Sequence, residues 1–594
     1  MIWASGLVGA ATRVASAAAP GGPVGGGPGG LPAPGVSGAA ATGNSGAGAS
    51  PGLSPLALPH VEYHFLAPFL ILVGSAVALL AVSSLLRGQF RKGLYAAWTV
   101  VTALVAMGWT WHLWGQVVGH SSGHAPRPGA VSAVSGALAI DGFGLFITIT
   151  MCVALVLGAL MAESYLPQEH LEGPEFYVLA MLSASGGILM GLANDLIVVF
   201  LGLEILSLSL YVLSAYHRRR ATSGEAGMKY FILGSFSSAF FLYGVALTYG
   251  ATGSTSLPAI ATFLSTNVLL SNGVLLAGMA FLLVGLGFKV AAVPFHAWAP
   301  DVYQGAPTPA TGFMAAAAKT AGFAAMLRVF LSAFGTQSET WRPMVWVLAA
   351  LTLMVGSVLA VVQTDVKRIL AYSSVSHAGY VLVGLQAATL TGAISRNGLA
   401  GASFYLLAYT FMVAGSFAIV TVVGGAGDSH HSLTDYRGLA GDRPAMALAF
   451  TILLVSQAGI PFTTGFIAKF NVISAVVSHG RPPDYVLGVL AMLAAAVSTF
   501  FYLRIILAMY SPRPDQEAAD DHGAAETAVR GGGAGTGGAV VRGGGAATLV
   551  RPARAVAVPT TLAIAIGGCV VFTVVFGIIP GPMIHLAERA GLLF

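Results

Sequence analysis

The sequence contains very little charge. Only 8% of its 594 residues are Asp, Glu, Lys or Arg, whereas 56% are hydrophobic. An average soluble domain carries about 25% charged residues, so this chain has too few to cover a water-facing surface. A soluble enzyme, a nucleic-acid-binding protein and a disordered chain are therefore excluded. The class that remains is an all-α polytopic membrane protein, because a membrane β-barrel shows short alternating segments instead of long apolar runs.

Cysteine is also scarce, and the familiar motifs of soluble catalysis are missing. Cys152 and Cys569 lie in apolar runs without a CxxC pair or a Cys/His cluster, so we expect no disulfide framework and no metal site. The predicted spans hold no GxSxG, HExxH or Walker A sequence, and no GxGxxG opens a helix; GxSxG occurs only at 48–52 and 119–123, outside the spans. The net charge of +5 comes mostly from Lys and Arg in short loops, which indicates membrane topology and not nucleic-acid binding.

Two segments have too few bulky apolar residues to fold alone. Residues 1–56 are rich in Gly, Ala, Pro and Ser, and residues 511–556 are rich in Gly and Ala with scattered Arg. Both compositions are typical of disordered chain. For the first segment a signal peptide is the alternative, because Ala17–Ala19 resemble a cleavage region. No positive charge precedes the thin apolar stretch there, which argues against cleavage.

Long apolar runs fill most of the remaining sequence. A membrane-spanning helix needs about 20 mostly apolar residues, and about fourteen segments meet this requirement. They are 65–86, 94–114, 143–166, 176–193, 195–216, 228–250, 274–294, 308–334, 345–364, 369–390, 399–424, 445–478, 485–510 and 557–587. The run 445–478 is too long for one straight helix and contains Pro461. The shorter run 257–270 is expected to lie at the membrane interface.

Lys and Arg are unevenly divided between alternate loops. Most lie in one set of loops, near residues 87–92, 218–220, 367–368, 437–443 and 513–554. Cytoplasmic loops carry the excess of these residues, so this set is predicted to be cytoplasmic. Both chain termini are then expected on the outer side, in agreement with an even number of spans.

Four ionisable residues lie inside predicted spans, where a charge is costly. They are Glu204 in FLGLEILSLSLY, Lys289 in LLVGLGFKVAAVPFH, Lys319 in TGFMAAAAKTAGFAAM and Lys469 in AGIPFTTGFIAKFNVI. Such residues usually face the protein interior and serve ion pathways. The structural alternative is a fixed ion pair between Glu204 and one lysine, which would leave the other two lysines unexplained. The four residues are therefore our candidate proton-translocating groups.

Pro294 and Pro461 fall inside or at the edge of spans that hold lysines. Each proline removes a backbone hydrogen bond and frees the carbonyl four residues earlier, that of Val290 or Gln457. Irregular backbone at membrane depth persists only where it is buried or faces a water-filled cavity. Paired interrupted helices also favour an inverted-repeat transporter with its site near the membrane midplane. Freed carbonyls, water and a lysine would together form a protonatable site.

Two histidines accompany these spans. His296 lies just beyond Pro294, and its imidazole is suited to proton relay because its ordinary pKa is near neutrality. We include His296 as a weaker candidate. His377 is interpreted as a packed or hydrogen-bonded histidine, since neither residue has a His, Asp or Glu neighbour at metal-ligand spacing.

A long motif resembles a known family. The stretch GFKVAAVPFHAWAPDVYQGAPTPATGFMAAAAK, Gly287–Lys319, resembles the antiporter-like membrane subunits of respiratory complex I, the bacterial NADH-quinone oxidoreductase. Its DVYQGAPTP string, Asp301–Pro309, is similar to the N-type subunits in particular. Further matches are FLGLEILSLSLYVL, EAGMKYFILGSFSSAF, DVKRILAYSSVSHAGYVL and GIPFTTGFIAKF, and together they span roughly residues 60–510.

The resemblance implies a fold of fourteen transmembrane helices with two inverted five-helix repeats, in which helices 7 and 12 are broken. The expected organisation is then helices 1–3 (57–175), the first repeat (176–335), the second repeat (336–510) and helix 14 (557–594). The chain departs from the family in its low-complexity extension (1–56) and in its disordered cytoplasmic loop (511–556), which are expected from composition. The resemblance places a glutamate on helix 5 and lysines on helices 7, 8 and 12, which match Glu204, Lys289, Lys319 and Lys469. Lys319 and Lys469 favour the N-type over the L-type and M-type sister subunits.

The resemblance also implies an activity. The chain would be a proton-translocating subunit of a translocase in the bacterial inner membrane, coupling electron transfer from NADH to quinone to outward pumping. FMN, iron–sulfur clusters, NADH and quinone would be bound by other subunits and no cofactor by this chain. Its partners would be M-type and small K- and J-type membrane subunits and the peripheral arm.

Three alternatives stay open at this point. A cation/proton antiporter or membrane hydrogenase subunit would share the same helices, although Lys319 and DVYQGAPTP argue against it. A scaffold that moves no ions would gain nothing from three buried lysines. A transporter of an organic solute would need a cluster of polar or aromatic residues, and none stands out in the sequence.

Overall fold

The computed structural model describes residues 61–86, 93–118, 131–267, 272–390, 393–512 and 558–592. The expected N-terminal extension, 1–56, lies outside these residues, and so does almost all of the expected 511–556 loop. All described residues belong to one compact unit, residues 59–594.

Helices make up most of the described chain, in agreement with the long apolar runs. In order they are α1 (Tyr63–Leu85), α2 (Leu94–Val117), α3 (Gly142–Gln168), α4 (Glu175–Leu192), α5 (Leu196–Ser214), α6 (Ala221–Thr252), α7 (Leu257–Thr266), α8 (Gly273–Lys289), α9 (Trp298–Gly305), α10 (Thr308–Arg328), η1 (Val329–Ala333), η2 (Gly335–Gln337), α11 (Ser338–Val361), α12 (Val366–Ala387), α13 (Arg396–Gly424), η3 (Leu433–Tyr436), α14 (Leu439–Asp442), α15 (Pro444–Ala458), α16 (Thr464–Val477), α17 (Pro482–Tyr510), α19 (Thr560–Ile578) and α20 (Gly581–Glu588). Two short antiparallel pairs connect helices: β1 (Val131–Ala133) with β2 (Leu138–Ile140), and β3 (Thr389–Leu390) with β4 (Ala393–Ile394). A helix satisfies its own backbone hydrogen bonds, which the interior of a membrane requires.

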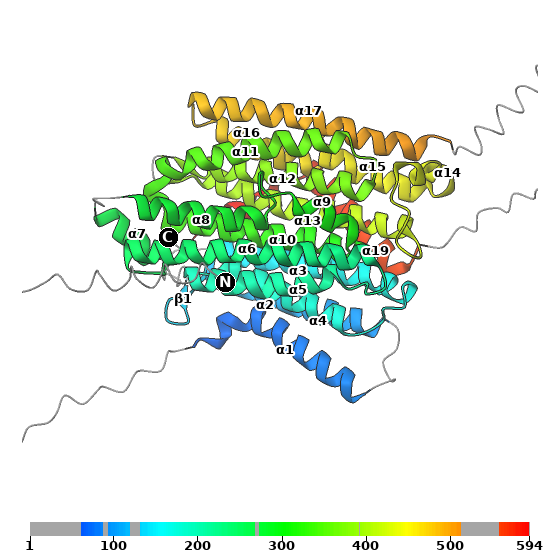
Figure 1. Cartoon of the computed structure of the whole chain (residues 1–594), viewed down its shortest axis with the longest axis horizontal. Coiled ribbons are helices and arrows are strands. Elements are labelled where there is room, and N and C mark those ends of the chain that lie inside the picture. Colours follow the sequence, from blue (N-terminus) through cyan, green and yellow to red (C-terminus); the bar gives the residue numbers. More distant parts are fainter. Residues whose placement is uncertain are drawn as a thin grey trace, which may run out of the picture. The chain divides into compact units, whose positions relative to one another are not determined.

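The helices lie side by side, with α10 and α13 inside the bundle and α1 and α17 at opposite edges (Figure 1). Every residue of α10 is buried. By contrast, α1 and α17 carry many exposed large apolar side chains, among them Val77 and Met492. The outer helices therefore present apolar surface, while α10, the helix that holds Lys319, is enclosed by protein.

Of the described helices, eleven are long and apolar enough to cross a membrane. This confirms a polytopic α-helical membrane protein, while the count of fourteen stays a prediction. Three expected spans are not among these eleven helices, for separate reasons. The segment at 369–390 forms a full helix, α12, with many polar residues. The helix in the segment at 274–294 stops early, at Lys289, and the segment at 445–478 is divided between α15 and α16. In the described part of the run 257–270, which ends at residue 267, the helix α7 has ten residues.

Two expected helices are interrupted near their prolines. The first stops at Lys289, and α9 begins only at Trp298; the second stops at Ala458, and α16 begins at Thr464. The interruptions occupy the fourth position in each of the two expected groups of five helices. The repeats themselves stay a prediction. The segment at 557–587 differs from expectation, because α19 ends at Ile578 before Pro580 and a separate short helix follows.

Glycines allow the first two helices of each expected five-helix group to approach closely. A Cβ at Gly186 of α4 would lie 2.7 Å from the carbonyl oxygen of Gly202 on α5. Likewise, a Cβ at Gly356 of α11 would lie 2.6 Å from the amide nitrogen of Ser376 on α12. Small residues at these crossings permit backbone contact between helices, which is a common way of packing in membranes.

Loops with many basic residues meet at one end of the bundle. Arg220, before α6, and Lys367, in the first turn of α12, both contact Asp428 in the loop after α13. The opposite end holds a buried ion pair between Arg328 and Asp141, 2.8 Å apart. This grouping agrees with the set of loops predicted to be cytoplasmic, and the side of the membrane stays a prediction.

Candidate functional site

Lys289 is the last residue of α8 and is 3% exposed. Its Nζ donates to Ser207 Oγ on α5 at 2.8 Å and to Tyr230 Oη on α6 at 3.3 Å. The Tyr230 ring stacks on Trp298, the first residue of α9, with ring centroids 4.5 Å apart. The amine at the first break is thus held by two hydroxyl groups from neighbouring helices.

Glu204 lies one helical turn before Ser207 on α5 and is half-buried. Its Oε1 is buried and has no hydrogen-bond partner among the described residues. Among the described residues, the carboxylate also forms no ion pair with Lys289. The alternative of a permanent Glu204–lysine pair is therefore not what the structure contains: Ser207 occupies the position of the direct partner.

Lys319 lies in the middle of α10 and is 2% exposed. Its Nζ donates to the backbone carbonyl of Ser374 on α12. The Ser374 side chain in turn contacts Tyr303 Oη, with 3.3 Å between the two oxygens. Gly322, one turn after Lys319, packs against the stem of Lys289, because a Cβ there would lie 3.3 Å from Lys289 Cγ. The lysines of α8 and α10 are therefore neighbours in the bundle.

Lys469 on α16 binds the end of the helix that precedes it. Its Nζ donates to the carbonyl oxygen of Gln457 at 2.8 Å and to that of Ala458 at 2.9 Å. Both carbonyls lie in the last turn of α15, which ends before Pro461. The ammonium also lies 4.7 Å from the centre of the Tyr380 ring. The carbonyl of Gln457, expected to be free, thus meets a lysine, whereas Val290 has no such contact with Lys289 in the described structure.

A chain of polar side chains runs between the contacts of Lys319 and those of Lys469. His377 lies one turn after Ser374 on α12, and its Nε2 is 3.2 Å from Tyr502 Oη on α17. Tyr502 Oη donates to Gln457 Oε1 at 3.5 Å. His377 Nδ1 is 2.6 Å from Tyr405 Oη, so both ring nitrogens have partners.

His296 does not belong to this chain of contacts. It lies in the interrupted segment between α8 and α9 and is half-buried. Its Nδ1 is buried and without a hydrogen-bond partner among the described residues, and its ring lies 6.5 Å from that of Tyr372. Its position at the break keeps it near Lys289 along the chain, but no hydrogen bond joins the two.

Nothing in the described residues resembles a metal centre. Groups of three or more His, Cys, Asp or Glu with suitable positions do not occur there. Cys152 and Cys569 are buried as free thiols on α3 and α19.

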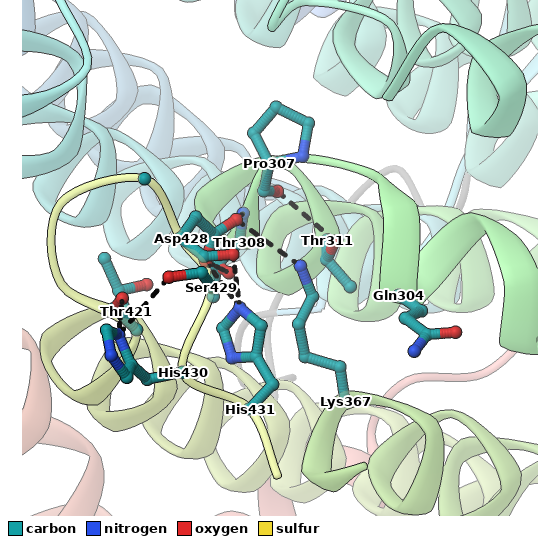
Figure 2. A network of polar contacts seen from close by, with 12 residues as sticks. Gln304, Pro307, Thr308, Thr311, Lys367, Thr421, Asp428, Ser429, His430 and His431 are labelled. Atoms are coloured by element: carbon teal, nitrogen blue, oxygen red, sulfur yellow. Dashed lines mark hydrogen bonds and ion pairs between the residues drawn. The ribbon is translucent and has the colours of Figure 1, made fainter. Parts of the chain in front are cut away.

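Asp428, in the loop after α13, accepts several hydrogen bonds and forms several ion pairs. Figure 2 shows Lys367 and His431 directed at its carboxylate, with Lys367 Nζ 3.5 Å and His431 Nε2 2.8 Å from its oxygens. Thr308, the first residue of α10, donates its amide hydrogen to Asp428 Oδ2 at 3.3 Å and its hydroxyl to Oδ1 at 2.5 Å. Arg220 Nη1 lies 3.1 Å from Oδ2. Burial opposes the charged carboxyl, but Lys367 and His431 outweigh it and hold the pKa of Asp428 below its ordinary value.

Asp428 therefore joins, at their loop ends, the two helices that meet at Lys319. It caps α10, the helix of Lys319, and pairs with the first turn of α12, the helix of Ser374 and His377. Lys367 Nζ also donates to the carbonyl of Ala306, just before α10, at 2.8 Å. These contacts join the start of α10 to the start of α12.

Comparison with known proteins agrees with the sequence motifs. Residues 193–497 match the family described as "NADH:quinone oxidoreductase/Mrp antiporter, TM". NADH-quinone oxidoreductase subunit N of Trichlorobacter lovleyi is 42% identical, covering 77% of this chain and 90% of that protein. NADH-quinone oxidoreductase subunit N of Mycobacterium bovis is 39% identical, covering 91% of this chain and 99% of that protein.

This chain belongs to the NADH-quinone oxidoreductase subunit N family. A chain in the structure of respiratory complex I from Thermus thermophilus with bound aureothin has the same fold. It is 29% identical with a TM-score of 0.64, and the match covers 88% of this chain and 99% of that chain. The protein is a multi-pass membrane protein of this family.

Several polar neighbours of the lysines are not predictable from the sequence of this family member. Ser207, Tyr230 and Tyr502 carry no mark of a lysine partner. By contrast, the contact of the Gln457 carbonyl with a lysine and the hydrogen-bonded state of His377 agree with the predictions. The available signal was a hydroxyl, amide or imidazole inside an apolar run. That signal is weak, because Ser and Thr commonly donate to the carbonyl one turn earlier in the same helix, as Thr248 and Ser416 do here.

Proposed function

We propose that this chain is the proton-translocating N-type subunit of NADH-quinone oxidoreductase, and that Glu204, Lys289, Lys319 and Lys469 carry the protons. Protons would move outward when NADH oxidation and quinone reduction in other subunits change the charge or conformation of this subunit. FMN, iron–sulfur clusters, NADH and quinone belong to those other subunits in this proposal.

The observation that carries the proposal is the chemistry around the three amines. Each lysine is at most 5% exposed, and its described hydrogen-bond partners are neutral oxygens. Within the described chain none of the three forms an ion pair with a carboxylate. Burial destabilises the charged form of an amine that has no fixed counter-charge, so the neutral form becomes accessible. It can therefore release and regain a proton, which a permanently paired lysine cannot.

Glu204 supplies the switch in this scheme. Its free Oε1 lies one turn from Ser207, the partner of Lys289, so a small side-chain movement brings the carboxylate toward the amine. When the carboxylate is close, the ammonium form of Lys289 is favoured; when it withdraws, burial favours the neutral form. A tenfold change in the proton affinity of Lys289 corresponds to ~1.4 kcal/mol. The approach or withdrawal of a buried carboxylate can therefore change that affinity by a few powers of ten.

The route continues from Lys289 to Lys319 and then to Lys469. Gly322 brings the first two lysines together, and Ser374, His377, Tyr502 and Gln457 connect the second with the third. Water would complete the gaps between these groups. His296, at the first break, is proposed as an additional proton-handling group because its Nδ1 is unpartnered.

The proposal includes the surroundings of the chain. Its partners are the M-type subunit and the small K- and J-type subunits of the membrane arm, together with the peripheral arm. Its location is the bacterial inner membrane, with both termini on the outer side and the Asp428 end of the bundle in the cytoplasm.

NADH-driven proton pumping in membranes tests the proposal. Glu204→Gln and Lys289→Met should each lower pumping by about tenfold or more, at an unchanged amount of assembled complex. Glu588→Gln, which changes an exposed carboxylate on α20, is the matched control and should pump normally. Normal coupled pumping in both Glu204→Gln and Lys289→Met would refute the scheme.

A further inference from the structure

Trp298 connects the two sides of the first helix interruption. It is the first residue of α9 and is 3% exposed. Its indole Nε1 donates to the carbonyl oxygen of Phe288 at 3.0 Å. Phe288 lies in the last turn of α8 and directly precedes Lys289. One buried side-chain hydrogen bond therefore joins α9 to the end of α8, next to the candidate lysine.

The indole ring of Trp298 also supports the hydroxyl group that contacts Lys289. The rings of Trp298 and Tyr230 are nearly parallel, with an angle of 8° between them and centroids 4.5 Å apart. Tyr211 on α5 meets the Tyr230 ring edge-on, with 4.8 Å between the centroids. Aromatic pairs of these two kinds have a preferred geometry, so they orient a ring as well as bury it. The position of Tyr230 Oη, 3.3 Å from Lys289 Nζ, therefore depends on Trp298.

The second interruption is stabilised in a different way. There Lys469 itself donates to two carbonyl oxygens in the last turn of α15. At the first interruption Trp298 donates to a carbonyl in the last turn of α8. Carbonyl groups at membrane depth need such partners wherever a helix stops. Because the partner here is an indole, the amine of Lys289 is left to donate to two side-chain hydroxyl groups.

We propose that Trp298 is a positioning residue for proton transfer through Lys289. Its indole joins α9 to the end of α8 and orients the Tyr230 ring, so that the tyrosine hydroxyl accepts a hydrogen bond from the amine. This inference rests on the proposed function of Lys289 as a proton carrier. An acceptor beside the amine favours its ammonium form, so displacement of Tyr230 makes proton uptake less favourable. Trp298 thus acts on Lys289 through Tyr230.

The pH profile of NADH-driven proton pumping, measured in membranes that hold the assembled complex, tests this inference. Trp298→Phe removes the indole N–H and part of the stacked ring, and Tyr230→Phe removes only the hydroxyl. The alkaline limb of the profile is where the amine fails to take up a proton. We expect it to move to lower pH in both variants, by about one unit, the size of one hydrogen bond to a charged group. The double variant should match Tyr230→Phe, because the two residues act in series.

Trp341→Phe is the matched control. Trp341 lies in the first turn of α11 and is fully buried, and its indole donates to the carbonyl oxygen of Phe334 at 2.9 Å. The control loses the same kind of hydrogen bond and should leave the alkaline limb in place, even if the complex becomes less stable. An equal shift in Trp341→Phe, an unchanged profile in Trp298→Phe, or a double variant that shifts further than Tyr230→Phe would overturn the inference.

A second replacement keeps the inference testable if Trp298→Phe fails to assemble. Benzothienylalanine in place of Trp298 keeps the two-ring shape and replaces only the N–H by sulfur, and the limb should move in the same direction. Lys289→Met separates this inference from the proposed function. Normal pumping by Lys289→Met would refute the proposed function itself. Loss of pumping in Lys289→Met, with an unmodified profile in the Trp298 variants, would refute only the role of Trp298.

Discussion

Lys469 Nζ lies 2.8 Å from the carbonyl oxygen of Gln457, the residue whose backbone hydrogen bond is removed by Pro461. The lysine therefore replaces the missing amide of an interrupted helix. Gly459, with φ of 87°, provides the turn between α15 and Pro461. The interruption and the buried amine stabilise each other, since each satisfies a polar group that the other leaves exposed inside the membrane.

Gly459→Ala should disturb this arrangement directly. A Cβ there would lie 2.8 Å from Lys469 Cδ, and the positive φ adds a cost of roughly 1–2 kcal/mol for any other residue. We expect reduced thermal stability of the complex and reduced proton pumping. Gly480→Ala is the matched control: its φ is 70°, so it carries the same backbone cost, but its Cβ would meet nothing closer than 3.9 Å. If the two variants pump equally, the contact with Lys469 is unimportant for function.

Tyr502→Phe should interrupt the chain between His377 and Gln457. The change removes one buried hydroxyl, which lies 3.2 Å from His377 Nε2, and leaves the ring in place. The expected loss of stability is about 1 kcal/mol, whereas pumping should fall at least about tenfold if the hydroxyl transfers protons. Tyr510→Phe, at an exposed site on the same helix, serves as the control. Pumping by Tyr502→Phe equal to that of Tyr510→Phe would exclude this hydroxyl from the route.

Asp428→Asn should destabilise the bundle strongly. Lys367 would keep its charge at a buried position, and Arg220 at a half-buried one, without the carboxylate that neutralises them. Breaking one side of a buried pair costs about 3–5 kcal/mol, which thermal denaturation of the purified complex would detect at neutral pH. Asp435→Asn, at an exposed position nearby in the sequence, should change the denaturation temperature much less. Similar changes of the denaturation temperature for the two substitutions would show that the buried Asp428 contributes no more to stability than an exposed carboxylate.

The Asp428 substitution also has a predictable pH dependence. The pKa of this carboxyl is lower in the folded protein than its ordinary value of about 3.9. Its contribution is therefore complete above about pH 4 and is lost as the pH falls below that value toward the folded pKa. The stability difference between the unmodified protein and Asp428→Asn should be constant at neutral pH and shrink in acid. A stability difference that grows below pH 4 would contradict a negatively charged Asp428 carboxylate in the folded protein.

The positions of the unusual residues were predictable from the sequence because they depend on local features. A lysine such as Lys319 is recognisable inside an apolar run, and Pro294 and Pro461 mark the places where backbone hydrogen bonds are lost. The same local patterns predicted a helical membrane protein. They overestimated the continuity of the last span, because the helix ends at Ile578 ahead of Pro580.

The partners of these residues were decided only by the tertiary structure. Ser207 lies 82 positions from Lys289, and Asp428 lies 120 positions from Thr308, so neither contact has a local signature. The absence of a Glu204–Lys289 pair depends on where α5 and α8 meet, which packing determines. The sequence thus determined which groups are buried and where helices break, because hydropathy and proline act within a few residues. Helix packing alone decided whether a buried amine meets a carboxylate or a neutral oxygen, because that choice depends on distances between helices far apart along the chain.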